Sequence, residues 1–220
     1  LKEPEEKVTL GNGIQANIYQ QFQEGKRYAA GTDTSHGAGQ DFAVTVVLDS
    51  VTGYIVADIC SQVINPTELA VASVDLLNRY DAPIWAIEDN DWGILTIAMA
   101  QDLRYRRLHY RDSDHPGWHT YDTAGMSGGS RYILWGDLIE AVHSRSITVP
   151  NPEGLSQFFT VIRNPEKRGR IEAQYGTHDD YPMAVGMAWQ MRQYARPSGS
   201  ERGRRANPHR RRRRGWARWS

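Results

Sequence analysis

Four acidic residues each follow an apolar stretch, at three places in the chain. They are Asp33, Glu88, Asp179 and Asp180. Open α/β sheets build their functional sites where strands end. Carboxylates that are brought close together repel one another, so they stay ionised together only beside a divalent cation. The pattern therefore predicts a metal-dependent site for phosphoryl transfer.

The ligand chemistry favours magnesium or manganese, because carboxylate oxygens are hard ligands. Two such ions about 3.5–4 Å apart can share carboxylates, one activating a water and the other stabilising the leaving oxygen. His178 precedes the last acidic pair and could add a ligand or move a proton. The residues leave open which of Asp179 and Asp180 binds metal. A simpler interpretation also stands, because a single Asp at a strand end is most often a turn former or a helix cap.

The order of elements indicates a mixed α/β sheet with helices on its faces. Apolar and β-branched stretches predict strands at Tyr28–Thr32, Phe42–Leu48, Tyr54–Ile59, Pro83–Ile87, Arg106–Tyr110 and Arg170–Tyr175. Helical spacing predicts helices at 65–80, Asp91–Leu103, Ser130–His143 and Asp179–Tyr194. Leu155–Ile162 fits either type of element.

The first predicted helix fixes the direction of the strand that follows it. Asn65 can cap this helix, Pro66 suits its first turn, and Glu68 can close a capping box. A helical crossover makes the next strand parallel to the first strand of the sheet. We therefore expect Asp33 and Glu88 to leave neighbouring strands.

Composition indicates one globular domain. The chain has 220 residues, of which 40% are hydrophobic and 24% charged, as is ordinary for a globular protein. It contains no run of about 18 apolar residues, so we expect no membrane partner. The single cysteine, Cys60, excludes an internal disulfide and a multi-cysteine zinc site.

Charge divides the chain into an acidic body and a basic tail. Residues 196–220 hold ten arginines and Glu201, a charge of +9 (10 − 1), and residues 1–195 carry −9 (16 − 25). We expect residues 28–195 to form the folded domain and residues 196–220 to be a disordered Arg-rich tail. Residues 1–27 are polar and without a clear period. They are a linker, the edge of a missing upstream domain, or an ordered arm packed on the domain.

The local motifs resemble those of the nuclease domain of phage large terminase subunits, which has a ribonuclease H-like fold. The motifs are Gly31-Thr32-Asp33 with Gly37-x-Gly39-x-Asp41, Glu88-Asp89-Asn90-Asp91-Trp92-Gly93, Gly117-Trp118-His119-Thr120, and Glu172-Ala173-x-x-Gly176-x-His178-Asp179-Asp180. They occur in the family's order and cover roughly residues 28–195.

The resemblance implies a ribonuclease H-like mixed sheet flanked by helices, and a two-metal endonuclease that uses Mg²⁺ or Mn²⁺. The enzyme would cut concatemeric viral double-stranded DNA during genome packaging. The implied metal ligands are Asp33, Glu88, and Asp179 or Asp180, and the implied supporting residues are Asp41, His178 and Asn90. Portal protein, a small terminase subunit and an upstream ATPase domain are the implied partners besides DNA, in the cytoplasm of the infected host cell.

The chain departs from the family pattern at two places. It has no Gly-x-x-x-x-Gly-Lys-Ser/Thr phosphate loop, so the ATPase motor of terminases is absent from it. Asp122-Thr123-Ala124-Gly125 also stands where the family often has a basic pair.

DNA approaching an acidic body needs basic residues to meet it. One group consists of Arg104, Arg106, Arg107 and Arg111, and the other of Arg163, Lys167, Arg168 and Arg170. We prefer the second group as the DNA contact, because it precedes the last acidic motif and could form a hairpin over the site.

Two alternative functions remain compatible with the residues. The first is another ribonuclease H-like nuclease, such as a junction resolvase. The second is a non-catalytic module that docks on DNA or a portal, although such a module has no need of clustered carboxylates. An ATP-binding sugar-kinase-like fold would need a second Gly-rich phosphate motif, which the sequence lacks.

Overall fold

The centre of the molecule is a six-stranded sheet with the strand order β1-β2-β5-β4-β3-β6. We describe a computed structural model, over residues 2–37, 39, 41–121, 129–167 and 169–199. The strands of the sheet are β1 Glu6–Thr9, β2 Gln15–Ile18, β3 Tyr28–Asp33, β4 Ala43–Asp49, β5 Ile55–Ser61 and β6 Ile84–Ile87.

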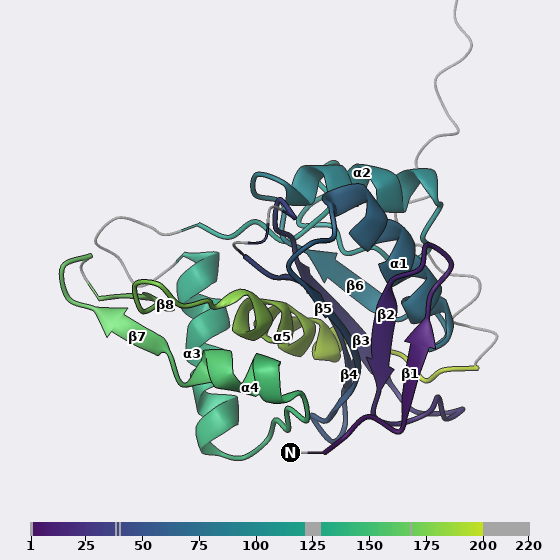
Figure 1. Cartoon of the computed structure of the whole chain (residues 1–220), viewed down its shortest axis with the longest axis horizontal. Helices are drawn as coiled ribbons and strands as arrows, with labels where there is room; N and C mark the ends of the chain where they lie inside the picture. The colour runs from purple at the N-terminus through teal and green to yellow at the C-terminus, as the bar shows by residue number, and fades with distance from the viewer. Residues whose placement is uncertain (1, 38, 40, 122–128, 168, 200–220) are drawn as a thin grey trace, which may run out of the picture.

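Helices cover both faces of this sheet (Figure 1). Helices α1 Pro66–Asn78 and α2 Gly93–Asp102 lie on one face. Helix α5 Asp180–Met191 lies on the other, and α3 Ser130–His143 and α4 Pro152–Phe158 pack against it. A separate hairpin of β7 Val161–Asn164 and β8 Arg170–Ala173 extends beyond α3 in Figure 1. The predicted fold class, a mixed sheet flanked by helices, is confirmed.

The strand directions follow from the connections between the strands. β3, β4 and β5 form an antiparallel meander, and β6 returns beside β3 in parallel after α1. The capping box predicted for α1 is present, since Asn65 accepts from the Glu68 amide and the Glu68 side chain accepts from the Asn65 amide. The crossover predicted from these cap residues therefore places β6 where expected.

Alternation along β3 separates the two faces of the sheet. Tyr28 and Ala30 pack in the core under α1, whereas Ala29 packs in the core under α5. Gly31 lies on the α5 face, and a Cβ there would stand 2.1 Å from the backbone oxygen of Ala184. A glycine at this position lets α5 approach the strand that carries Asp33.

Residues 6–18 form two strands that pair with the main sheet, which is the order expected of an arm packed on the domain. β2 pairs antiparallel with β5 through Asn17↔Asp58 and Ile18↔Ala57, and β1 pairs with β2. The buried side chains of Val8, Ala16 and Ile18 join the core under α1. Polar residues alternate with these three, which hides the apolar face of a short edge strand from a sequence reading.

Two other predicted strands differ from the structure. Arg106–Tyr110 is not a strand; it makes isolated bridges at Leu108 to Trp85 and at Tyr110 to Pro116, where the chain turns back. β8 is a strand, but it pairs only with β7 and lies outside the main sheet. The ambiguous stretch 155–162 contains the end of α4 and the start of β7.

The last described residues return to the start of β3. Pro197 bridges to Arg27, and Ser198 is buried and donates from its amide to the backbone oxygen of Lys26 at 2.8 Å. Most of the predicted tail, residues 200–220, lies outside the described residues. In the part of the chain that the structure describes, no helix is both long and apolar enough to cross a membrane.

Candidate metal centre

Asp33 and Glu88 lie side by side at the ends of two parallel strands. The register of β3 and β6 pairs Thr32 with Ile87, and the Glu88 amide donates to the Thr32 oxygen at 3.0 Å. By alternation, Asp33 shares a face with Ala29, and Glu88 shares that face with Ala86. Both carboxylates therefore belong to the face that α5 covers.

Asp33 is half-buried among other acids. Burial raises the pKa of Asp33 well above its usual range, and the charges of Glu88, Asp180 and Asp179 raise it further. Like charges gathered in one place favour the neutral form of an acid, and a divalent cation would offset this repulsion.

Asn90 fixes the side chain of Glu88. Its Nδ2 donates to Glu88 Oε1 at 3.1 Å and to the backbone oxygen of Thr120 at 3.1 Å. Trp118 bridges to Glu88 in parallel, so the predicted central segment runs beside the acidic motif. Gly93 permits the tight turn after Glu88, since a Cβ there would meet the Glu88 backbone oxygen at 1.8 Å.

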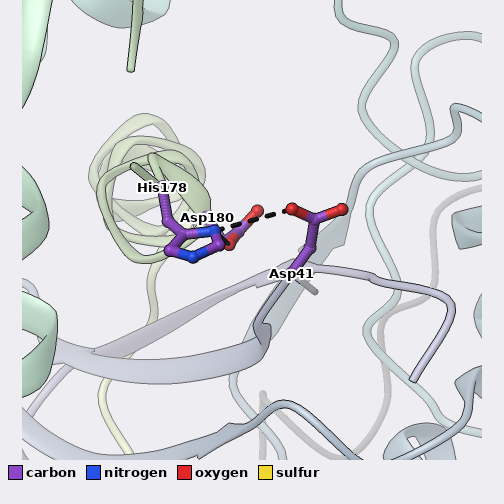
Figure 2. Close-up of side chains that lie close together, drawn as sticks. All are labelled: Asp41, His178 and Asp180. Carbon is purple, nitrogen blue, oxygen red and sulfur yellow. Dashed lines mark ion pairs between the residues drawn. The ribbon is translucent and has the colours of Figure 1, made fainter. Parts of the chain in front are cut away.

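Asp180 begins α5 and faces Asp41 and His178 (Figure 2). The ligand atoms of these three residues all lie within 4.8 Å of one another. His178 Nδ1 lies 3.5 Å from Asp41 Oδ1 and 3.7 Å from Asp180 Oδ2. Burial raises the pKa of Asp180 to about 6, and the charges of Asp41 and Asp179 add to this rise. The Phe42 amide opposes it by donating to Asp180 Oδ2 at 2.9 Å.

Asp179 has a different partner from its neighbour. Its Oδ2 accepts from Nη2 of Arg131, a buried side chain of α3, at 2.9 Å. Sequence reasoning missed Arg131, although one signal was available. A cation in the first turn of a helix opposes the helix dipole, so Arg131 needs a nearby anion.

The donor set matches a hard divalent cation. Carboxylate oxygens converge from β3, β6 and the start of α5, and the imidazole of His178 stands beside them. Magnesium and manganese take such oxygen ligands, and imidazole also binds transition metals such as zinc. The structure thus gathers Asp33, Glu88, Asp179 and Asp180 in one region, with Asp41, His178 and Asn90 in contact with them.

The preferred basic group lies on the β7–β8 hairpin, as the sequence suggested. Glu172 on β8 binds Lys167 Nζ at 2.8 Å and Arg170 Nε at 3.5 Å, so part of the positive charge is paired. Arg163 stands on β7 and is exposed, and Arg168 lies outside the described residues. In the other basic group, Arg111 binds Asp89 at 3.2 Å.

Comparison with known proteins identifies the fold. No protein-family model matches the chain, and no curated protein matches it either. Solved structures do match, each over 86% of this chain. They include the large terminase nuclease of thermophilic phage G20c with cobalt (15% identity, 91% of that chain, TM-score 0.68) and with magnesium (16%, 91%, 0.65).

The large terminase nuclease domain of Thermus phage P74-26 also matches, at 18% identity over 88% of that chain with a TM-score of 0.62. The structure of the G20c nuclease with bound zinc matches at a TM-score of 0.57. The chain therefore has the fold of phage large terminase nuclease domains, and the resemblance seen in its sequence motifs is confirmed at the level of the fold.

Proposed function

We propose that this chain is a metal-dependent endonuclease that cleaves concatemeric viral double-stranded DNA during genome packaging. One observation carries the proposal: Asp33, Glu88 and the Asp179–Asp180 pair converge, on the fold of solved terminase nucleases. The charges of acids from the other elements raise the pKa of Asp33, and this repulsion costs free energy unless a cation offsets it. A merely structural role would not require this convergence.

Asp33, Glu88 and the Asp179–Asp180 pair would hold the ions, which we propose to be two Mg²⁺ or Mn²⁺. The related solved nucleases carry cobalt, magnesium or zinc. Bound divalent ions supply positive charge for the phosphate and lower the pKa of water. Asn90 holds Glu88 in place, and the Phe42 amide holds Asp180. His178 Nδ1 lies 3.5 Å from Asp41 Oδ1 beside Asp180, and its ring would carry a proton to or from the reacting groups.

The β7–β8 hairpin is the proposed DNA contact. The chain runs from β8 through residues 174–179 directly into α5, so the hairpin and the acids are joined by a short connection. Arg163, Lys167 and Arg170 on this hairpin, together with Arg168, would bind backbone phosphates without reading sequence. Substituting Lys167 with Ala should lower DNA affinity and reduce the salt dependence of binding by about one phosphate contact.

The same proposal includes the larger assembly. In a packaging complex in the host cytoplasm, the nuclease would act beside an upstream ATPase domain, a small terminase subunit and a portal protein. The support for these partners is the shared fold and the order of the sequence motifs.

A plasmid-cleavage assay tests the activity directly. Wild type is incubated with Mn²⁺, Mg²⁺ or EDTA beside Asp33→Asn and Glu88→Gln. We expect metal-dependent cutting that both variants lose while they remain folded. The matched control is Asp102→Asn, which removes one exposed carboxylate at the end of α2 and should cut normally. If Asp33→Asn or Glu88→Gln still cut the plasmid, the assignment of these residues to the site would be wrong.

Substrate choice separates this function from a junction resolvase. Linear duplex, a four-way junction and an RNA–DNA hybrid are compared at equal concentration. A terminase nuclease should cut the linear duplex at least as well as the junction. Preference for the junction would favour the resolvase, and folded protein that cuts none of the three would favour a docking module.

A further inference from the structure

The buried guanidinium of Arg131 contacts Asp179 in the acidic centre, and the proposed chemistry gives this arginine no role. Its side chain is only 11% exposed. Nε and Nη2 both donate to the backbone oxygen of Ile171, at 3.3 and 3.1 Å, and Nη2 also donates to Asp179 Oδ2 at 2.9 Å. One planar fork thus joins the start of α3 to β8 and to the residue before α5.

Neighbouring acids in the sequence have opposite surroundings. Asp179 faces the cation of Arg131. Asp180 takes a backbone amide from Phe42 and faces Asp33, Asp41 and His178. A carboxylate already bound by a guanidinium is a poor ligand for a divalent ion, because the positive charge of the arginine offsets the negative charge of the carboxylate. The two residues therefore cannot be equivalent in metal binding.

Stability alone gives little reason for a cation at this position. Arg131 stands in the first turn of α3, where the helix dipole disfavours a positive charge. A buried ion pair is often no more stabilising than apolar residues of the same volume. Its clearest physical effect is to remove one negative charge from a centre that holds at least four carboxylates.

We propose that Arg131 is a positioning residue that neutralises Asp179 and so leaves Asp180 as the metal-binding member of the pair. This inference rests on the proposed metal-dependent function. Ser130 extends the link, since its hydroxyl donates to the His119 backbone oxygen and accepts from the Tyr121 amide. The start of α3 therefore connects the segment beside Glu88 with the start of α5.

The test is a double-mutant cycle read by calorimetric Mn²⁺ titration without DNA. The variants are Arg131→Met, Asp179→Asn and the double variant, with Arg79→Met as a matched control at an exposed site. Arg131→Met adds one net negative charge, so we expect Mn²⁺ to bind about tenfold more tightly. Asp179→Asn leaves the arginine unpaired, so we expect binding to weaken by about tenfold. The double variant restores the wild-type charge and should return to within about threefold of wild type.

Cleavage supplies a second readout of the same cycle. We expect Arg131→Met to lower kcat by about a hundredfold with little change in KM, because freed Asp179 competes with Asp180 for the ion. The double variant should recover at least about tenfold of that loss. Arg131→Lys should recover less, because an ammonium cannot reproduce the planar fork to Ile171 and Asp179.

Three results would overturn the inference. Loss of Mn²⁺ binding in both Asp179→Asn and the double variant would make Asp179 itself the ligand. A double variant as defective as Arg131→Met would give Arg131 a purely structural role. Because the titration needs no DNA, wild type that binds Mn²⁺ without cutting contradicts the nuclease but still allows the cycle to decide. Wild type that binds no Mn²⁺ overturns the inference as well.

Discussion

Asp58 and Asp33, on two strands of the same sheet, have very different surroundings. Asp58 on β5 is completely buried, and four neutral donors reach it: Asn17, Tyr19, Asn151 and Tyr181, at 2.7–3.2 Å. Asp33 on β3 is half-buried, and the groups that most affect it are other acids. Burial raises the pKa of both, but hydrogen bonds to Asp58 oppose the rise whereas charges near Asp33 increase it.

The difference separates structural from functional burial of charge. Asp58 joins β2, β5, the cap of α4 and the first turn of α5, so its hydrogen bonds serve the fold. Asp33 has no comparable set of donors among the contacts described, and its neighbouring acids are the surroundings expected of a cation site. A carboxylate with satisfied lone pairs indicates architecture, and a carboxylate among carboxylates indicates a site.

The largest expected effect comes from removing the satisfied acid. Asp58→Ala leaves buried donors of four side chains without their acceptor, and we expect it to lower the free energy of unfolding by about 3–5 kcal/mol. Asp33→Asn should leave the stability of the metal-free protein unchanged or higher, because it removes a repelled charge. Urea unfolding in EDTA measures both. An equal loss of stability in the two variants would contradict the contrast drawn between them.

Gly31→Ala tests whether the position of α5 maintains the site. The new Cβ would stand 2.1 Å from the Ala184 oxygen and 2.6 Å from the Ala188 nitrogen, so α5 has to move. We expect a loss of about 1–3 kcal/mol and at least about a tenfold loss of cleavage. The control is Gly136→Ala in α3, where a Cβ meets nothing within 4 Å and should stabilise the helix by up to about 1 kcal/mol. Unchanged cleavage in Gly31→Ala would show that the close approach is dispensable.

The pH dependence of stability should differ between metal-free wild type and Asp180→Asn. The folded-state pKa of Asp180 is raised from 3.8 to about 6, so the fold favours its neutral form. The stabilisation is therefore present below about pH 4 and is lost as the pH rises through 6. Between pH 4 and 7.5 we expect wild type to lose about 2 kcal/mol more than Asp180→Asn in chelator. Parallel stability curves for the two proteins would rule out this role for Asp180.

The smallest effect should come from removing one donor of Asp58. Tyr19→Phe deletes the longest of its four hydrogen bonds, at 3.2 Å, and we expect a loss of about 1 kcal/mol. Affinity for Mn²⁺ should stay as in wild type, because Tyr19 contacts the structural acid and not the acidic centre. A change in Mn²⁺ affinity would mean that the two carboxylates are coupled.

Local signals made part of this structure predictable from the sequence. The cap residues Asn65 and Glu68 act within one helical turn, so the start of α1 could be read directly. The crossover then gave the parallel pairing of β6 with β3, and with it the adjacency of Asp33 and Glu88. His178 and Asp180 are two residues apart, which also made their proximity easy to anticipate.

Contacts between distant segments could not be read in this way. The pairing of β2 with β5 depends on Asn17 meeting Asp58, and neither residue indicates its partner. Arg131 and Asp179 are likewise far apart in sequence, and their pairing depends on how α3 packs against α5. Strand β8 shows a further limit of prediction from sequence, because a short apolar run does not reveal which sheet the strand joins.

The close contact between Gly31 and α5 also sets the order in which the site can form during synthesis. Strands β3 to β6 leave the ribosome well before α5, and their pairing needs no residue beyond Ile87. Asp33 and Glu88 can therefore meet on an incomplete sheet, but Asp180 joins them only after the final helix docks on Gly31. A nascent or prematurely ended chain thus carries only part of the acidic centre, so any activity of this centre requires the final helix to be in place.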